Sequence, residues 1–174
     1  MIETILFIAG SICIVWVSIP SLRRPGSHGF YRFFAWEAIL GMFLMNVRGW
    51  FVHPFAWYQI ISWILLFASL VPIISGAYLL RHAGKPTDAL EATTQLVQSG
   101  IYRFIRHPLY ASLLTLAWGI FFKFPSLLDG CLAAVATAFL YATARADEAE
   151  CLVKFGEEYA GYMKKTKLFI PFIF

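Results

Sequence analysis

Two short segments of the chain bring together side chains that could do chemistry. The first, residues 99–110, has the sequence Ser-Gly-Ile-Tyr-Arg-Phe-Ile-Arg-His-Pro-Leu-Tyr, in which Arg106 and His107 directly precede Pro108. Proline is favoured at the first position of a helix, so we expect a helix to begin there. The N–H groups of a helix N-terminus next to an arginine and a histidine make a good site for an anion.

Tyr102, Arg103 and Tyr110 flank this candidate anion site and allow a second interpretation. Aromatic rings and arginines also gather where a membrane helix meets the headgroup region. Arg103 alone fits that interfacial belt better. The arginine–histidine–proline run with a tyrosine on each side favours a binding site.

The second segment, residues 145–150, has the sequence Arg-Ala-Asp-Glu-Ala-Glu. Acidic side chains at a membrane boundary can simply be solvated, or they can bind a cationic ligand. Asp147 and Glu148 are adjacent, and either could also accept a proton from a reacting group. We therefore treat Asp147, Glu148 and Arg106 as candidate catalytic residues, and Arg145 as a candidate substrate-binding residue.

The composition places both segments in a membrane protein. Of the 174 residues, 60% are hydrophobic and 14% are charged, and the mean hydropathy is +0.69. A soluble domain has roughly 25% charged residues, so this chain cannot cover a water-facing surface. The net charge of +4 comes from residues beside apolar segments, as is typical of membrane proteins, so we expect no nucleic-acid partner.

Five apolar segments could cross the membrane, because a spanning helix needs roughly 20 predominantly apolar residues. The last two are shorter, about 22 Å at 1.5 Å per residue, and we expect them to form an antiparallel hairpin that turns at residues 123–126. A further turn is expected at residues 51–56, and Pro72 is expected to kink the third span. The five segments are Thr4–Leu22, Phe33–Val47, Trp57–Leu80, Pro108–Phe122 and Gly130–Ala144.

The expected fold is an all-α integral membrane protein of about five transmembrane helices. We expect no Rossmann domain, because the chain lacks a glycine-rich strand–turn–helix fingerprint. Residues 1–80 are expected to form three N-terminal transmembrane helices, and residues 81–174 a catalytic half with a cofactor-binding loop, the hairpin and a cytoplasmic C-terminal amphipathic helix. In that tail, apolar residues recur at three- and four-residue steps, while residues 168–174 are expected to return to the membrane surface.

The distribution of positive charge predicts the orientation. If residues 21–32, 81–107 and 145–174 share one side, that side carries all the lysines and arginines except Arg48 and Lys123. Cytoplasmic segments carry the positive excess, so we expect the N-terminus outside, the C-terminus in the cytoplasm and an odd number of spans. A prokaryotic inner membrane is preferred, with the endoplasmic reticulum as the alternative.

Glu37 lies inside an expected span, and carboxylates within a membrane are functional candidates by default. Arg32 lies within two turns of it, which also allows a purely structural acid. We treat Glu37 as a second candidate substrate-binding residue. The three cysteines share no metal-ligand spacing with one another or with the histidines, so we expect neither a metal site nor a disulfide.

The two segments together resemble a known family. Residues 95–110, Gln-Leu-Val-Gln-Ser-Gly-Ile-Tyr-Arg-Phe-Ile-Arg-His-Pro-Leu-Tyr, are followed by Asp147-Glu148 and by Phe155-Gly-Glu-Glu-Tyr-Ala-Gly-Tyr162. This combination is similar to the isoprenylcysteine carboxyl methyltransferase family, which has the phospholipid methyltransferases as relatives. The resemblance covers roughly residues 90–174, and the first three spans match only in hydropathy.

The resemblance implies methyl transfer from S-adenosyl-L-methionine (SAM) to a lipid or lipophilic small molecule at the cytoplasmic face. His107 or Arg106 would suit the carboxylate of SAM, Asp147 or Glu148 its cationic end, and aromatic rings its sulfonium or adenine. Carried over residue by residue, the cofactor contacts fall on Thr94, Gln95, Leu96, Val97, Tyr102, His107, Pro108, Leu109, Tyr110 and Asp147.

One position departs from the family pattern. The prenylcysteine enzymes have an arginine four residues before the first acid, where it helps to bind the carboxylate of the substrate. Here that position is Thr143, and Arg145 lies about 200° around a helix from it. The departure puts a carboxylate substrate in doubt and leaves a thiol, an amine or another lipid nucleophile open.

Two other kinds of protein remain alternatives. A sterol-reductase-like enzyme that uses NADPH shares a distant similarity in the His-x-x-Tyr region, although such proteins are much larger. A membrane scaffold or transport component could also keep this fold without enzymatic activity. The sequence does not indicate the oligomeric state.

Overall fold

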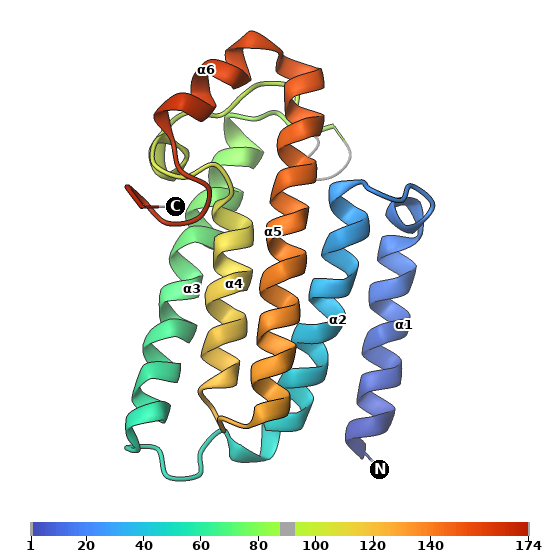
Figure 1. The fold of residues 1–174 in the computed structure, drawn as a ribbon, viewed down its shortest axis with the longest axis vertical. Coiled ribbons are helices and arrows are strands. Elements are labelled where there is room, and N and C mark those ends of the chain that lie inside the picture. Colours follow the sequence, from blue (N-terminus) through green and yellow to red (C-terminus); the bar gives the residue numbers. More distant parts are fainter. Residues whose placement is uncertain (1, 88–92, 174) are drawn as a thin grey trace. The chain divides into compact units, whose positions relative to one another are not determined.

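The computed structural model describes residues 2–87 and 93–173, and most of these residues lie in helices (Figure 1). The described residues hold no strand, only two isolated bridges. This all-α architecture without a Rossmann fold agrees with the expected class. The helices are α1 (Ile2–Leu22), α2 (His28–Asn46), η1 (Val47–Gly49), α3 (Trp57–His82), η2 (Gly100–Arg103), α4 (Pro108–Phe121), α5 (Leu127–Phe155) and α6 (Glu157–Lys165).

Three of these helices, α1, α3 and α5, are long and apolar enough to cross a membrane. The apolar α4 is shorter, at 14 residues, and α2 is less hydrophobic. Side chains along α1 remain largely exposed, and Ser18 is its one buried residue. A helix with apolar side chains on its outside is suited to lipid, so the chain is an integral membrane protein. The count of five spans and the orientation remain predictions.

The starts of α3 and α4 agree with the sequence, whereas the boundaries of α2 and α5 differ from it. Helices α3 and α4 begin at Trp57 and Pro108 as predicted, and α2 begins five residues earlier than expected, at His28. Ser27 caps α2, since its Oγ accepts a hydrogen bond from the N–H of Phe30 over 3.3 Å.

The predicted amphipathic tail helix is wrong in its extent. Helix α5 was expected to end at Ala144, but it continues to Phe155, because residues 145–155 contain no helix breaker. The break comes at Gly156, whose backbone has φ +54° and ψ −130°. That conformation is open almost only to glycine. The chain turns there into α6 (Figure 1).

The described residues fall into two compact units. The first contains the chain up to Phe67 and the segment Leu114–Asp147, and the second contains Ala68–Leu113 and the chain from Glu148 onward. The division at residue 80 into an N-terminal part and a catalytic half remains a prediction.

In the first unit, α1 packs on α2 (Figure 1). A Cβ atom added to Gly10 would lie only 2.7 Å from a methyl group of Leu40, so glycine allows this close approach. Ser11 donates a hydrogen bond from Oγ to Oε2 of Glu37 over 2.6 Å. The core of the first unit contains small or flexible side chains with no exposed area, namely Ala35, Met42, Ala117, Ala133, Ala136 and Leu140.

A buried lysine closes one end of the first unit. Lys123, with no exposed area, places its Nζ 3.4 Å from the ring centre of Trp63 and 5.1 Å from that of Trp50. The same ammonium donates to Oε1 of Gln59 over 3.1 Å, while Nε2 of Gln59 donates to the carbonyls of Lys123 and Gly49. We call these residues the lysine cage; they join the turn before α5 to the segment before α3.

Candidate functional site

The candidate site lies in the second unit, where the loop before α4 meets the end of α5 and the C-terminal segment. Arg106 is the centre of this cluster. Its Nε donates to Oε1 of Glu148 over 2.6 Å, and its Nη1 donates to the carbonyls of Met163 and Thr166. The side chains of Arg106 and Glu148 are 10% and 2% exposed, so the pair is shielded from water.

His107 completes a row of charged and aromatic groups beside this pair. Its Nε2 lies 3.7 Å from Oε1 of Glu148. The imidazole stacks on the ring of Tyr110, with centres 5.4 Å apart, and meets the ring of Phe169 edge-on at 6.4 Å. A carboxylate, a guanidinium, an imidazole and two further aromatic rings therefore gather within a few ångströms.

Backbone pairing fixes the loop that carries Arg106 and His107. The N–H of Arg106 donates to the carbonyl of Lys167 over 2.8 Å, and that of His107 to the carbonyl of Leu168 over 3.2 Å. The N–H of Lys167 returns a bond to the carbonyl of Phe104 over 3.0 Å. These bonds form a short parallel bridge and hold both side chains against α5.

This bridge changes the expected place of residues 168–174. Leu168 and Phe169 are each only 6% exposed and are packed inside the second unit, whereas Ile170, Phe172 and Ile173 are exposed. The segment was predicted to return to the membrane surface as a whole. Its first two residues instead contact the loop, since the Leu168 carbonyl accepts the N–H of His107 and the Phe169 ring meets the His107 ring.

Tyr102 contributes its backbone carbonyl to the site. Its carbonyl accepts a hydrogen bond from the hydroxyl of Tyr162 over 2.6 Å, and the two residues are 6% and 4% exposed. Burial raises the pKa of the Tyr162 phenol, although the Arg106 guanidinium acts in the opposite direction. Tyr162 therefore remains a protonated donor that ties α6 to η2.

Glycine at two positions allows neighbouring segments of the second unit to pack closely. Gly76 of α3 faces the start of α4, and a Cβ there would lie 2.9 Å from Leu109 and 3.0 Å from Pro108. Gly84 lies against Thr93, where a Cβ would be 2.6 Å from the Thr93 methyl group. The carbonyl of Gly84 accepts the N–H groups of Thr94 and Gln95.

The predicted cofactor residues fall into three groups by their exposure. Val97, Tyr102, His107, Pro108 and Tyr110 are buried, whereas Leu96 and Leu109 are partly exposed, and Thr94 and Gln95 are exposed. Residues 88–92, at the start of the expected loop, lie outside the described residues.

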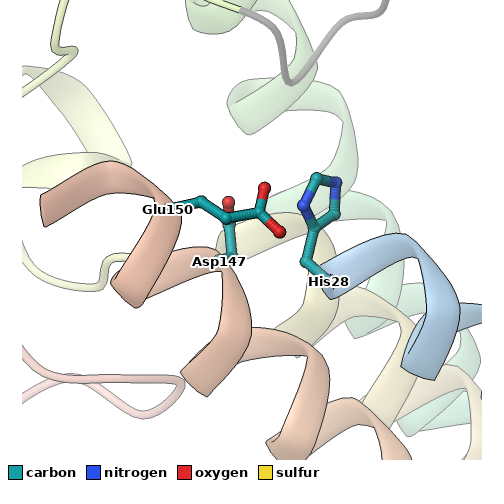
Figure 2. A group of neighbouring side chains, drawn as sticks. All are labelled: His28, Asp147 and Glu150. Carbon is teal, nitrogen blue, oxygen red and sulfur yellow. The ribbon is translucent and has the colours of Figure 1, made fainter. Parts of the chain in front are cut away.

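The acids and candidate substrate residues are placed differently. Glu148 is buried, Asp147 is partly exposed and Arg145 is exposed. In the first unit a carboxylate oxygen of Asp147 lies within 4.8 Å of a ring nitrogen of His28, and Figure 2 shows both side chains. Glu37 contacts Ser11 in that unit.

The sequence did not single out the residues that complete the cluster. The backbone of Met163 and Thr166 and the ring of Phe169 were not predicted as parts of the site, and Tyr162 was noted only within the family motif. The sequence could have indicated a structural role for Tyr162. A tyrosine in an amphipathic segment needs a hydrogen-bond partner for its hydroxyl when it is buried.

Comparisons with known proteins identify the family of the chain. A family model described as phospholipid methyltransferase matches residues 57–157, more than half of the chain, and the chain belongs to this family. Methanethiol S-methyltransferase 1 of Bradyrhizobium diazoefficiens is 28% identical over 116 residues, which cover 63% of this chain and 39% of that protein. The chain thus matches less than half the length of this relative. No solved structure matches the chain.

Proposed function

We propose that this chain transfers a methyl group from SAM to a lipophilic acceptor at the cytoplasmic face of a membrane. The observation that carries the proposal is the buried cluster of Arg106, His107 and Glu148. It lies within the stretch that matches the phospholipid methyltransferase family.

The donor set of the site fits SAM. This molecule combines a carboxylate, an ammonium, a sulfonium and an adenine ring, and when bound it supplies an electrophilic methyl group. His107, together with the N-terminus of α4, suits the carboxylate. The acids at positions 147 and 148 suit a cationic group, and the rings of Tyr102 and Tyr110 suit the sulfonium or adenine.

In this proposal Arg106 does more than bind the carboxylate of SAM. Two of its nitrogen atoms already bind Glu148 and the carbonyls of Met163 and Thr166. It therefore acts first as a positioning residue that orients Glu148 and closes the C-terminal segment over the loop. Positioning is a large part of catalysis for a direct displacement.

The acceptor is a thiol or an amine in this proposal. Thr143, which stands where the prenylcysteine enzymes have a carboxylate-binding arginine, is fully buried, and its Oγ1 donates to the carbonyl of Phe139 over 2.7 Å. It is thus unavailable to a substrate carboxylate. A thiol ionises near pH 8.5 and needs little help, whereas an ammonium must lose a proton, for which Glu148 or Asp147 is at hand.

The test begins with calorimetric titration of SAM into the detergent-purified wild-type chain. We expect saturable binding, which His107→Ala and Asp147→Ala should each weaken at least tenfold, an estimate of about 1.4 kcal/mol for one lost contact. Glu150→Ala, one turn from Asp147 on the same helix, serves as the matched control. Failure of correctly folded wild-type protein to bind SAM would overturn the proposal.

Transfer itself is then measured by mass spectrometry with three acceptors: a long-chain alkanethiol, phosphatidylethanolamine and a prenylcysteine carboxylic acid. We expect methylation of the thiol or the amine and none of the acid. Methylation of the acid alone would contradict the role given to Thr143.

A further inference from the structure

An apolar groove runs along the second unit, apart from the cluster around Arg106. It is lined by the part of α3 between Leu70 and Leu79 and by Gly100 and Ile101 of η2. Its side chains are apolar apart from Ser75, and several are widely exposed, as Ile74 shows with 66%. A row of exposed apolar side chains along a spanning helix is suited to an alkyl chain.

The groove has a defined floor because Gly100 allows η2 to lie on α3. The backbone of Gly100 has φ +58°, and a Cβ atom there would lie 2.6 Å from a methyl group of Leu79. A side chain at this position would strain the backbone and require the Leu79 methyl group to move. Glycine at position 100 therefore favours the close approach of η2 to α3.

Basic side chains follow the lining residues along both elements of the groove. Arg81 and His82 form the last turn of α3, directly after the lining residues, and Arg103 ends η2. The three side chains are exposed. Within residues 2–87 and 93–173, neither arginine forms an ion pair.

His82 contacts Tyr78, one of the residues that line the groove. Its ring stacks on that of Tyr78 with centres 4.2 Å apart, and its Nδ1 donates to the Tyr78 carbonyl over 2.8 Å. The lining of α3 thus passes from a mainly apolar stretch to the basic residues Arg81 and His82 within one turn of helix. This pattern complements an amphiphile with a long chain and a negative head.

We propose that α3 and η2 form a binding site for an anionic phospholipid, with one acyl chain in the groove and its phosphate held between Arg81 and Arg103. Arginine binds phosphate oxygens through its forked donors. The site does not depend on the proposed enzymatic activity. It has a consequence for that activity, because the lipid rests on η2, whose Tyr102 carbonyl is bound to Tyr162 in the candidate site.

The test is native mass spectrometry of the full chain in detergent, titrated with phosphatidylglycerol or with phosphatidylcholine of the same acyl chains. Wild-type protein should bind phosphatidylglycerol about tenfold more tightly, the scale expected for two arginines near one phosphate. The double variant Arg81→Gln/Arg103→Gln should lose this preference. Arg23→Gln/Arg24→Gln, which changes two other exposed arginines, should keep it.

A second pair of variants tests the groove itself. Ile74→Asn places a polar group in the acyl path and should weaken phosphatidylglycerol binding at least tenfold, whereas Ile64→Asn, at an equally exposed position on the same helix outside the groove, should not. Equal affinity of the wild-type protein for both lipids would overturn the proposal. Retained preference in the arginine double variant or unchanged binding by Ile74→Asn would do the same.

Discussion

Arg106 and Glu148 are 42 positions apart in the sequence, yet Nε of the arginine donates to the glutamate carboxylate over 2.6 Å in a nearly water-free surrounding. Neither charge is easily tolerated there without the other, since a buried charge that loses its partner is strongly destabilising. The same guanidinium also holds the carbonyls of Met163 and Thr166. One side chain therefore connects the loop before α4 with α5, with α6 and with the residue that follows α6.

We expect the forked geometry of the Arg106 guanidinium to matter more for stability than its charge. Arg106→Lys keeps the ion pair with Glu148 but cannot reach both carbonyls, so at least one buried acceptor loses its donor. We expect a loss of about 1–3 kcal/mol in the free energy of unfolding. Thermal unfolding in detergent measures it, with the exposed Arg103→Lys as control. Equal stability of the two variants would show that Nη1 contributes nothing.

We expect Tyr162 to make the stability of the fold depend on pH in the alkaline range. Burial raises the pKa of its phenol above the unfolded value of about 10, so the folded chain keeps a proton that the unfolded chain releases. The contribution of Tyr162 is complete below pH 10 and falls as the pH rises above it, by up to about 1.4 kcal/mol per unit. Unfolding curves of wild type and Tyr162→Phe between pH 8 and 11 should therefore converge. Parallel curves would refute this.

Two glycines of the C-terminal region should respond in opposite ways to alanine. Gly156 needs a backbone conformation with positive φ, so Gly156→Ala should cost about 1–3 kcal/mol of stability even though no atom lies near its Cβ position. Gly161 lies inside α6, also in open space, and Gly161→Ala should stabilise by up to about 1 kcal/mol. Denaturation of both variants under the same conditions decides the point; the same sign in both would contradict it.

The lysine cage predicts a coupling between two side chains. Trp63→Leu leaves the Lys123 ammonium buried against an aliphatic group, and Lys123→Met removes the charge instead. In the double variant the cost of Trp63→Leu should shrink by about 1–2 kcal/mol, the scale of a desolvated cation–π contact. A double-mutant cycle in thermal stability measures this term. Additive effects would mean that the ring face does not stabilise the ammonium.

Hydropathy and helix signals predicted most of the fold. Trp57 and Pro108 begin helices where expected, because an apolar run after a turn and a proline at a first helical position are local signals. The end of α5 was missed because polar residues 145–155 resemble a separate surface segment. They nevertheless contain nothing that stops a helix before Gly156.

The site was predicted only in part, for a physical reason. Arg106 and His107 could be proposed because they directly precede a predicted helix start, and Glu148 because it lies in an acidic run after a predicted span. Their partners are carbonyl groups of Met163 and Thr166 and the backbone of Lys167, which every residue type carries equally. Pairing through the backbone leaves little trace in the sequence, so the role of the C-terminal segment emerged only in three dimensions.

The position of these partners has a consequence for the order in which the protein acquires its structure during synthesis. The groups that bind Arg106 are translated 42, 57 and 60 residues after it. While the ribosome makes α4 and the first part of α5, none of these three partner groups has yet been synthesised. Helices that cross the bilayer can insert one by one, but the cluster can assemble only after Thr166 has emerged.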